Sequence, residues 1–183
     1  MSPKIPPEPW HAFLTEVDAL VSGEVSFHCL GGFVMQQLHD LPRPTLDVDT
    51  LSVTPKDQMT LLIERAGKGS ELHIKHKIYL DIVTVCQPPD RYEDRLTEMF
   101  PGAYKRLRLF ALEAHDLALA KLLRNSQRDR EDVKFLAKRV PLDITTLSDR
   151  YAKEMRPYMA NEAREDLTLK LWIEMIEEDR QKP

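Results

Sequence analysis

The chain has 183 residues, of which 42% are hydrophobic and 31% are charged, and its formal net charge is −4. This length and apolar content suffice for one large core, or for one domain with a helical appendage. A protein that coats nucleic acid without sequence preference is usually basic, so the acidic balance disfavours that class, although a local basic groove stays open. No apolar run approaches the length of a membrane span and the N-terminus has no signal-peptide pattern, which predicts a cytoplasmic protein with no membrane partner.

The first elements along the chain are predicted to be an arm, a helix and a short buried strand. Four prolines within residues 1–9 exclude a regular helix there, so this segment is expected to form an extended arm. Apolar side chains recur at helical spacing over residues 10–21, which predicts a helix with one face on the core. After it we expect a strand over residues 27–30, a turn at Gly31 and Gly32, and a short helix over residues 33–39.

The next strand carries two carboxylates, Asp47 and Asp49, separated by one residue. Alternate residues of an extended chain share a face, so both carboxylates are expected to point the same way. Leu46 and Val48 occupy the other face, and the pattern predicts that they point into the core.

A third carboxylate, Asp81, lies in a segment that reads as strand. Residues 71–85 favour extended structure, with a hairpin turn near residues 75–77, and the second half of the segment is apolar apart from Asp81 and one threonine. An unpaired charge in a core is costly, which indicates a specific role for this acid. Between the two strands, Thr54 as N-cap and Pro55 at the first helical position predict a helix start.

The rest of the chain is predicted to be mostly helical. The fold class expected is α+β: a mixed sheet with flanking helices, spanning residues 1–112, followed by a helical domain over residues 113–183. The later elements predicted are a helical turn within residues 92–100, a strand over 108–112, two helices joined near 125–127, and helices over 143–158 and 161–178.

Two acids at a strand end are ambiguous when they stand alone, because many strand ends carry acids for solubility. Three features favour a functional site here: the double glycine ahead of the acids, the side chains of Arg43 and Thr45 just before them, and Asp81 downstream. Three carboxylates from two neighbouring strands can hold two magnesium ions, which activate an attacking oxygen and stabilise a leaving pyrophosphate. A glycine turn at a helix N-terminus provides a site for phosphate.

These segments resemble the nucleotidyltransferase superfamily of the polymerase-beta type. Its mark is a strand ending in Gly-Gly or Gly-Ser, a helix, a strand bearing Asp-x-Asp, and a third acid on a later strand. Within it the chain is similar to a small nucleotidyltransferase-like family of unknown function related to the AbiEii abortive-infection toxins. The segments that carry this resemblance are CLGGFVMQQL, RPTLDVDTLSV, IYLDIV and AHDLALAKLLRNSQRDREDVKFL.

The resemblance implies a ligand set. It assigns Asp47, Asp49 and Asp81 to Mg²⁺ or Mn²⁺, and Gly31 and Gly32 to the triphosphate of an NTP substrate. Most active members have serine after the first glycine, where its hydroxyl contacts phosphate, so the second glycine is a departure from the pattern. Backbone N–H groups can still cradle an anion at this place.

A basic cluster follows in the helical half. Lys121, Arg124 and Arg128 would share one helix face, and two interpretations stay open: a solvated basic face, or Lys121 and Arg124 closing over the nucleotide, as the resemblance implies. Asp129 and Asp132 are expected to cap the next helix and to pair with Arg128 or Arg130, and are not placed in the metal site.

The histidines and cysteines are predicted to be structural. His73 and His76 fall in the expected hairpin, where they would face opposite sides of a strand and would not chelate one ion. Cys29 and Cys86 lie in apolar runs without zinc-site spacing, which predicts buried, reduced thiols.

The function expected is transfer of a nucleoside monophosphate from an NTP to an acceptor hydroxyl, with phosphate charge neutralised by Arg43, Thr45, Lys121 and Arg124. By resemblance, the chain is a candidate toxin of a toxin–antitoxin pair, with tRNA or a protein as acceptor and a cognate antitoxin as partner. The alternatives are a nucleotide- or protein-binding module that has lost turnover, which the second glycine and the acidic charge favour, and a metal-dependent phosphohydrolase.

Overall fold

The computed structural model describes residues 5–181, which form two compact units. The first unit contains the residues up to Thr84 together with Leu96–Leu112, and the second contains Val85–Arg95 together with the residues from Glu113 onward. The sequence-based domain limits differ from this division for residues 85–95, which they place in the first domain. Of the expected N-terminal arm, residues 5–9 form neither helix nor strand, and residues 1–4 lie outside the described part of the chain.

The first unit is built on a five-stranded mixed sheet with the strand order β3-β2-β1-β5-β4. β1 pairs antiparallel with β2 and parallel with β5, β2 pairs parallel with β3, and β4 pairs antiparallel with β5. The sheet and the helical second half confirm the predicted α+β class. The strands are β1 (Val25–Cys29), β2 (Asp47–Thr54), β3 (Tyr79–Ile82), β4 (Thr97–Met99) and β5 (Leu107–Ala111).

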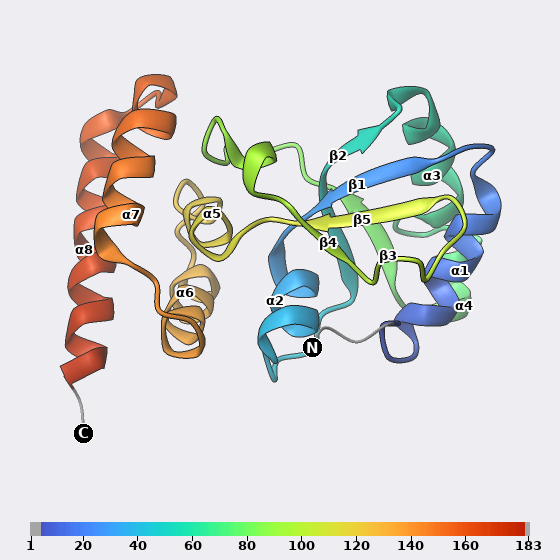
Figure 1. The fold of residues 1–183 in the computed structure, drawn as a ribbon, viewed down its shortest axis with the longest axis horizontal. Coiled ribbons are helices and arrows are strands. Elements are labelled where there is room, and N and C mark those ends of the chain that lie inside the picture. The colour runs from blue at the N-terminus through green and yellow to red at the C-terminus, as the bar shows by residue number, and fades with distance from the viewer. Residues whose placement is uncertain (1–4, 182–183) are drawn as a thin grey trace. The chain divides into compact units, whose positions relative to one another are not determined.

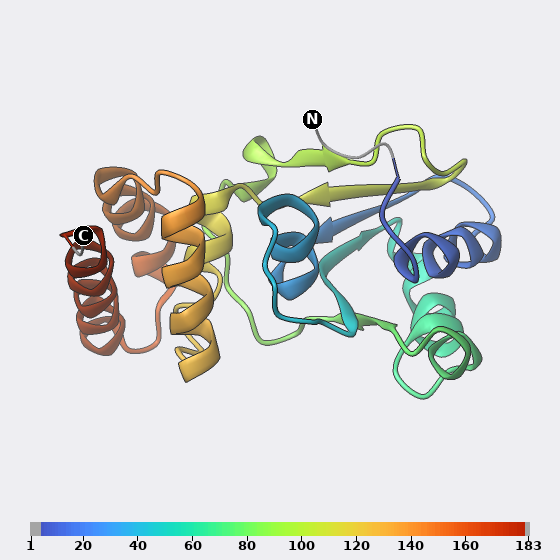
Figure 2. The same ribbon diagram turned by 90° about the horizontal axis from the view of Figure 1, so that it is seen from below.

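The first unit also contains the helices α1 to α4. α1, α3 and α4 lie together at one side of it in both ribbon views, and α2 lies apart from them (Figures 1 and 2). The core contains fully buried apolar side chains from the helices and the strands, among them Phe13, Phe27, Phe33 and Val48. The helical elements of the unit are α1 (Trp10–Leu20), α2 (Gly31–His39), η1 (Lys56–Gln58), α3 (Met59–Ala66) and α4 (Glu71–His76).

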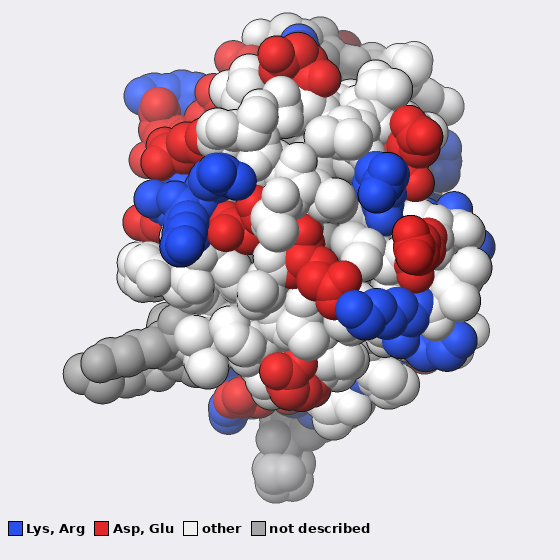
Figure 3. All heavy atoms as spheres, turned by 90° about the vertical axis from the view of Figure 1, so that its right-hand side faces the viewer, with Lys and Arg blue, Asp and Glu red and all other residues white. Residues whose placement is uncertain are grey.

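The face of the first unit that carries α1, α3 and α4 has charged side chains of both signs. Lys and Arg side chains stand beside Asp and Glu side chains over this face (Figure 3). One such pair joins Lys75 Nζ to Glu16 Oε1 at 2.7 Å. This mixture is typical of a solvated surface and not of a groove that follows a nucleic-acid backbone.

The strand predicted over residues 71–85 is wrong in its first half. Ser70 is the N-cap of α4 and its side chain accepts a hydrogen bond from the His73 amide at 3.1 Å, while Lys77 ends the helix in a left-handed conformation. A local cap of this kind outweighs the strand pattern, because it satisfies amides that begin a helix. His73 and His76 therefore lie on a helix and not in a hairpin.

Two further local predictions are wrong. Thr54 ends β2 and does not cap a helix, and Pro55 precedes η1 without any side-chain cap. Leu46 lies just outside β2 and has 58% of its surface exposed, whereas Val48 is fully buried as expected. The face alternation of a strand applies only within its hydrogen-bonded length, and β2 begins one residue after Leu46.

The second unit is helical and contains a cluster of ion pairs around one buried carboxylate. The Asp116 carboxylate is fully buried and accepts hydrogen bonds from the guanidinium groups of Arg95 and Arg150, and Arg95 also pairs with Glu154. Arg95 thus ties residues 85–95 to this unit. Its elements are η2 (Tyr92–Arg95), α5 (Ala114–Leu119), α6 (Gln127–Arg139), α7 (Ile144–Arg150), the π-helical turn η3 (Tyr151–Met155), η4 (Arg156–Tyr158) and α8 (Glu162–Gln181).

None of the helices within residues 5–181 combines the length and the apolar character that crossing a bilayer requires.

Candidate functional site

Three carboxylates meet where β2 and β3 run side by side. Asp47 and Asp49 lie at the start of β2, and the parallel register with β3 places Asp49 opposite Asp81. One oxygen from each of these three side chains lies within 4.8 Å of the others. Asp47 and Asp49 are half-buried and Asp81 is exposed, so the cluster opens to solvent. We call Asp47, Asp49 and Asp81 the acid triad.

The donor set of the acid triad fits a hard divalent cation. Mg²⁺ and Mn²⁺ prefer carboxylate oxygens and keep several water ligands, which a solvent-facing cluster allows. Three formal negative charges this close together repel one another, and a bound cation relieves that repulsion. The triad predicted from the sequence is therefore assembled in space, and it is a candidate metal site.

Two hydroxyl groups contact Asp47. Thr45 Oγ1 donates a hydrogen bond to Asp47 Oδ1 at 2.7 Å, and the Tyr79 hydroxyl donates a longer one to Asp47 Oδ2 at 3.5 Å. Burial raises the pKa of the Tyr79 hydroxyl, and the negative charges of Asp47 and Asp81 raise it further, so the group stays protonated and able to donate. Sequence reasoning missed Tyr79. Tyr79 is paired with Asp47 across β2 and β3, and this pairing is visible only once the register of the two strands is known.

Gly31 allows the Asp49 carboxylate to lie against the backbone. Its φ angle is +69°, a conformation that disfavours residues with a side chain, and a Cβ built there would lie 1.9 Å from Asp49 Oδ2. Gly31 is also the first residue of α2, and the preceding Leu30 donates its amide hydrogen bond to the carbonyl oxygen of Asp49 at 3.0 Å. The N-terminus of α2 is thereby placed beside the acid triad.

Gly32 faces Thr45. A Cβ at position 32 would lie 2.8 Å from Thr45 Oγ1 and 3.1 Å from Thr45 Cβ. The Thr45 side chain thus fills the space that a serine side chain at this position would need. The departure from the Gly-Ser pattern and the presence of threonine at position 45 are consequently two parts of one packing arrangement.

The helix N-terminus offers a place for an anion next to the candidate metal site. The first amides of a helix have no intrahelical acceptor, and their dipoles favour negative charge. Neither Gly31 nor Gly32 has a side chain that would cover these amides. A polyphosphate bound to a cation on the acid triad can therefore reach them. The predicted role of both glycines in triphosphate binding stays a prediction.

The predicted phosphate-binding side chains lie in different places. Arg43 is half-buried in the loop before β2, and its contact with phosphate stays a prediction. Lys121 and Arg124 belong to the second unit. α5 ends at Leu119 and α6 begins at Gln127, so the expected continuous helix face that would join Lys121, Arg124 and Arg128 is not formed.

Lys121 and Arg124 make ion pairs with the acids that follow them. The Lys121 ammonium is buried and donates to Asp132 Oδ2 at 2.9 Å, while Arg124 donates two hydrogen bonds to Asp129 at 2.8 and 2.6 Å. Asp129 also forms a capping box with Ser126 at the start of α6. Asp129 therefore takes part in capping as expected, but it pairs with Arg124 and not with Arg128 or Arg130.

Cys29 offers no reactive thiolate. Cys29 is fully buried, and burial raises the pKa of its thiol to about 12, with a smaller opposing effect from a hydrogen bond with Thr50. Cys86 is half-buried, and its thiol donates to the carbonyl oxygen of Ala120. A thiol that stays protonated at neutral pH is a poor nucleophile.

Comparison with known proteins identifies the family. The family model described as "Nucleotidyltransferase of unknown function (DUF6036)" matches residues 16–180, a range that includes α2, β2, β3 and the acid triad. The comparisons found no matching curated protein and no matching solved structure. The relation to AbiEii-type toxins stays a prediction. The double glycine, the two acids of β2 and the third acid of β3 are the features expected of a nucleotidyltransferase, and the chain belongs to this nucleotidyltransferase family of unknown function.

Proposed function

We propose that the chain transfers a nucleoside monophosphate from an NTP to an acceptor hydroxyl, with Mg²⁺ or Mn²⁺ held by Asp47, Asp49 and Asp81. The observation that carries this proposal is the meeting of three carboxylates from two paired strands beside the N-terminus of α2. When bound there, the divalent ions would neutralise phosphate charge and lower the pKa of the acceptor hydroxyl.

The residues around the triad have separate tasks in this reaction. Thr45 and Tyr79 hold the Asp47 carboxylate in one orientation, and Gly31 leaves room for the Asp49 carboxylate. The backbone amides at the start of α2 receive the β- and γ-phosphates. Arg43 adds positive charge as the nucleotide binds, whereas Lys121 and Arg124 are already paired with Asp132 and Asp129 within the second unit.

The transfer itself forms one bond and breaks one. The acceptor oxygen attacks the α-phosphorus, the bond from the α-phosphorus to its bridging oxygen breaks, and pyrophosphate leaves on the opposite side. The acceptor proton passes to the exposed Asp81 carboxylate and from there to water. The exposure of Asp81 suits it to this exchange, whereas Asp47 and Asp49 are half-buried.

Transfer of label from α-labelled NTPs tests the proposal. Purified protein is incubated with Mg²⁺ or Mn²⁺ and each of the four NTPs in turn, with total RNA and the protein itself as acceptors. Asp47→Ala is the test variant, and Asp57→Ala, an exposed acid on η1, is the matched control. Label that moves with the wild type and the control, and not with Asp47→Ala, supports the proposal. Label that Asp47→Ala transfers equally well contradicts it.

The acceptor and the biological role belong to the same proposal. We infer that the acceptor is tRNA or a protein, that the protein acts as a toxin, and that a cognate antitoxin restrains it; these steps rest on the resemblance alone. Labelled material separated into RNA and protein fractions identifies the acceptor class. Growth arrest on expression of the wild type, and normal growth on expression of Asp49→Ala, is the result expected of a toxin.

A binding module without turnover is the second candidate. Gly32 favours it, because the serine hydroxyl that contacts phosphate in most active relatives is missing and Thr45 fills its space. In this case an NTP with Mg²⁺ raises the melting temperature of the wild type, Asp47→Ala loses that shift, and no label moves. Release of inorganic phosphate without a labelled acceptor would instead indicate a phosphohydrolase.

A further inference from the structure

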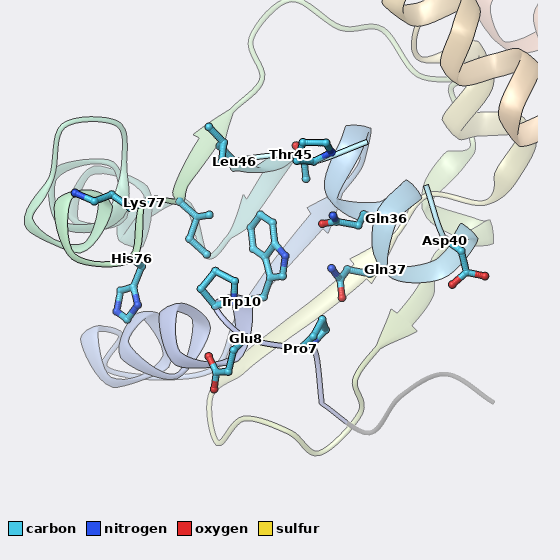
Figure 4. Close-up of a pocket in the computed structure, with 13 residues that line it drawn as sticks. Pro7, Glu8, Trp10, Gln36, Gln37, Asp40, Thr45, Leu46, His76 and Lys77 are labelled. Carbon is cyan, nitrogen blue, oxygen red and sulfur yellow. The ribbon is translucent and has the colours of Figure 1, made fainter. Parts of the chain in front are cut away.

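A pocket of about 560 Å³ lies within the first unit beside the candidate metal site. Its walls come from the segment that leads into α1, the second half of α2, the segment just before β2, and residues 76–78 between α4 and β3 (Figure 4). Its volume is within the range of about 300–1,000 Å³ that is usual for small-molecule sites. Sequence reasoning did not reveal it, because its walls come from segments far apart in the chain.

The pocket combines apolar walls with amide groups. Trp10 packs against Phe33 with ring centroids 5.0 Å apart, and Leu46 lines the pocket with 58% of its surface exposed. Gln36 and Gln37 enter from α2. Leu46 is therefore an exposed surface that gains free energy when an apolar ligand covers it, whereas Trp10 is 4% exposed and contributes little of that surface.

The Gln36 side chain points to a ligand with hydrogen-bonding groups. Its Oε1 atom is buried and has no hydrogen-bond partner within the described residues, and Figure 4 shows its amide facing the interior of the pocket toward Trp10. A buried polar atom without a partner costs free energy, and a ligand that donates a hydrogen bond to it would remove that cost once a rotation of the Gln36 side chain brings Oε1 to the pocket surface. A purely aliphatic ligand would not.

Thr45 connects the pocket to the acid triad. Its side chain lines the pocket, and its hydroxyl donates to Asp47 Oδ1 at 2.7 Å. In the view of Figure 4, Thr45 and Glu8 lie at opposite sides of the pocket. The lining contains two acids, Glu8 and Asp40, and one lysine, Lys77. Negative charge in the pocket disfavours a phosphate group there, so a ligand would direct its phosphates toward the triad and its uncharged part into the pocket.

We propose that this pocket binds the nucleobase of the nucleotide whose phosphates lie at the acid triad. A base is flat and apolar on its faces and carries hydrogen-bond donors and acceptors on its edge, which matches the Trp10 and Leu46 walls and the Gln36 amide. The inference rests on the proposed function for the phosphate end of the ligand. The base comes either from the NTP or from the terminal nucleotide of an RNA acceptor.

Binding measurements separate the base from the phosphates. Calorimetry with Mg²⁺ compares an NTP, inorganic tripolyphosphate and a short oligoribonucleotide. Gln36→Leu removes the amide at nearly constant volume, and Gln58→Leu is its matched control, because Gln58 is also half-buried, has a buried Oε1 atom without a partner and lies outside the pocket. We expect Gln36→Leu to weaken NTP binding about tenfold, as the loss of one buried hydrogen bond predicts, without changing tripolyphosphate binding.

A second pair of variants tests the apolar wall. Leu46→Ser should weaken the same ligand severalfold, whereas Ile63→Ser, at a residue of α3 that is 49% exposed and outside the pocket, should not. A loss confined to the NTP shows that the donor supplies the base, and a loss confined to the oligoribonucleotide shows that the acceptor supplies it. Unchanged affinity of Gln36→Leu and Leu46→Ser for both ligands overturns the proposal.

Failure of the proposed function gives a different result. If the phosphate site is wrong, tripolyphosphate does not bind the wild type, and Asp49→Asn binds NTP as the wild type does. Free nucleosides then test the pocket without phosphates: binding that Gln36→Leu weakens and Asp49→Asn leaves unchanged supports a nucleobase pocket. Wild-type protein that binds neither nucleosides nor nucleotides overturns it.

Discussion

Replacing Asp81 by asparagine should stabilise the protein without metal and destabilise it with metal. The three carboxylates of the acid triad have oxygens within 4.8 Å of one another. At that distance two unit charges repel by about 1 kcal/mol in water-like surroundings and about 3 kcal/mol at an effective dielectric constant of 20. Asp81 is exposed, so the lower figure applies to each of its two pairs. We therefore expect Asp81→Asn to gain about 1–2 kcal/mol of folding free energy in the absence of divalent ions.

Thermal unfolding with and without Mg²⁺ measures this effect. For a chain of this length a change of 1–2 kcal/mol corresponds to about 2–8 °C in melting temperature. In a chelator, Asp81→Asn should melt above the wild type by this amount, and in excess Mg²⁺ the order should reverse, because only the wild type gains the full binding free energy of the ion. Asp57→Asn, an exposed acid on η1, should show neither change. Equal melting temperatures of wild type and Asp81→Asn in the chelator would refute the reasoning.

Three further predictions concern single residues. Gly31→Ala places a side chain at a φ of +69° and against the Asp49 carboxylate of the acid triad. It should lower the free energy of unfolding by about 1–2 kcal/mol through backbone strain alone, and it should remove the rise in melting temperature that Mg²⁺ causes. A retained rise would contradict the geometry. Lys121→Met leaves the buried Asp132 carboxylate without its ammonium partner and should lower the free energy of unfolding, measured in urea, by about 3–5 kcal/mol. The additional change Asp132→Leu should restore most of this free energy. Burial by itself raises the pKa of Asp129, but hydrogen bonds, chiefly from Arg124, outweigh it and lower the pKa to about 2. Because the folded pKa lies below the unfolded value of about 4, the stabilisation is present above pH 4 and is lost as the pH falls toward 2; Asp129→Asn should lack this acid-dependent loss.

Acid unfolding of the second unit can be followed separately from that of the first. The chain has two tryptophans, Trp10 in the first unit and Trp172 in the second. Trp172 donates its indole hydrogen bond to Asn125 Oδ1 at 3.0 Å, so it lies close to the turn that Arg124 and Asp129 hold together. Fluorescence of a Trp10→Phe variant then reports unfolding of the second unit alone. A transition that Asp129→Asn leaves unchanged between pH 4 and pH 2 would show that other acids control it.

The local part of the site could be predicted because it depends on short-range chemistry. The spacing of Asp47 and Asp49, the double glycine and the strand before it are properties of neighbouring residues, and the structure has them on β2, at the start of α2 and on β1. The errors were also local. Ser70 caps α4 where the sequence indicated a strand, and Leu46 lies one residue outside the strand that was expected to bury it.

The order of residues establishes which side chains are available and which of them share a strand or a turn. Folding in three dimensions brings Asp81 opposite Asp49, Tyr79 into contact with Asp47, and the Thr45 side chain into the space beside Gly32. These contacts depend on the pairing of β2 with β3 and on the position of α2 beside β2, which bring together residues that are far apart in the chain. Propensity and periodicity describe one segment at a time, whereas register and side-chain packing are settled by the free energy of the whole core.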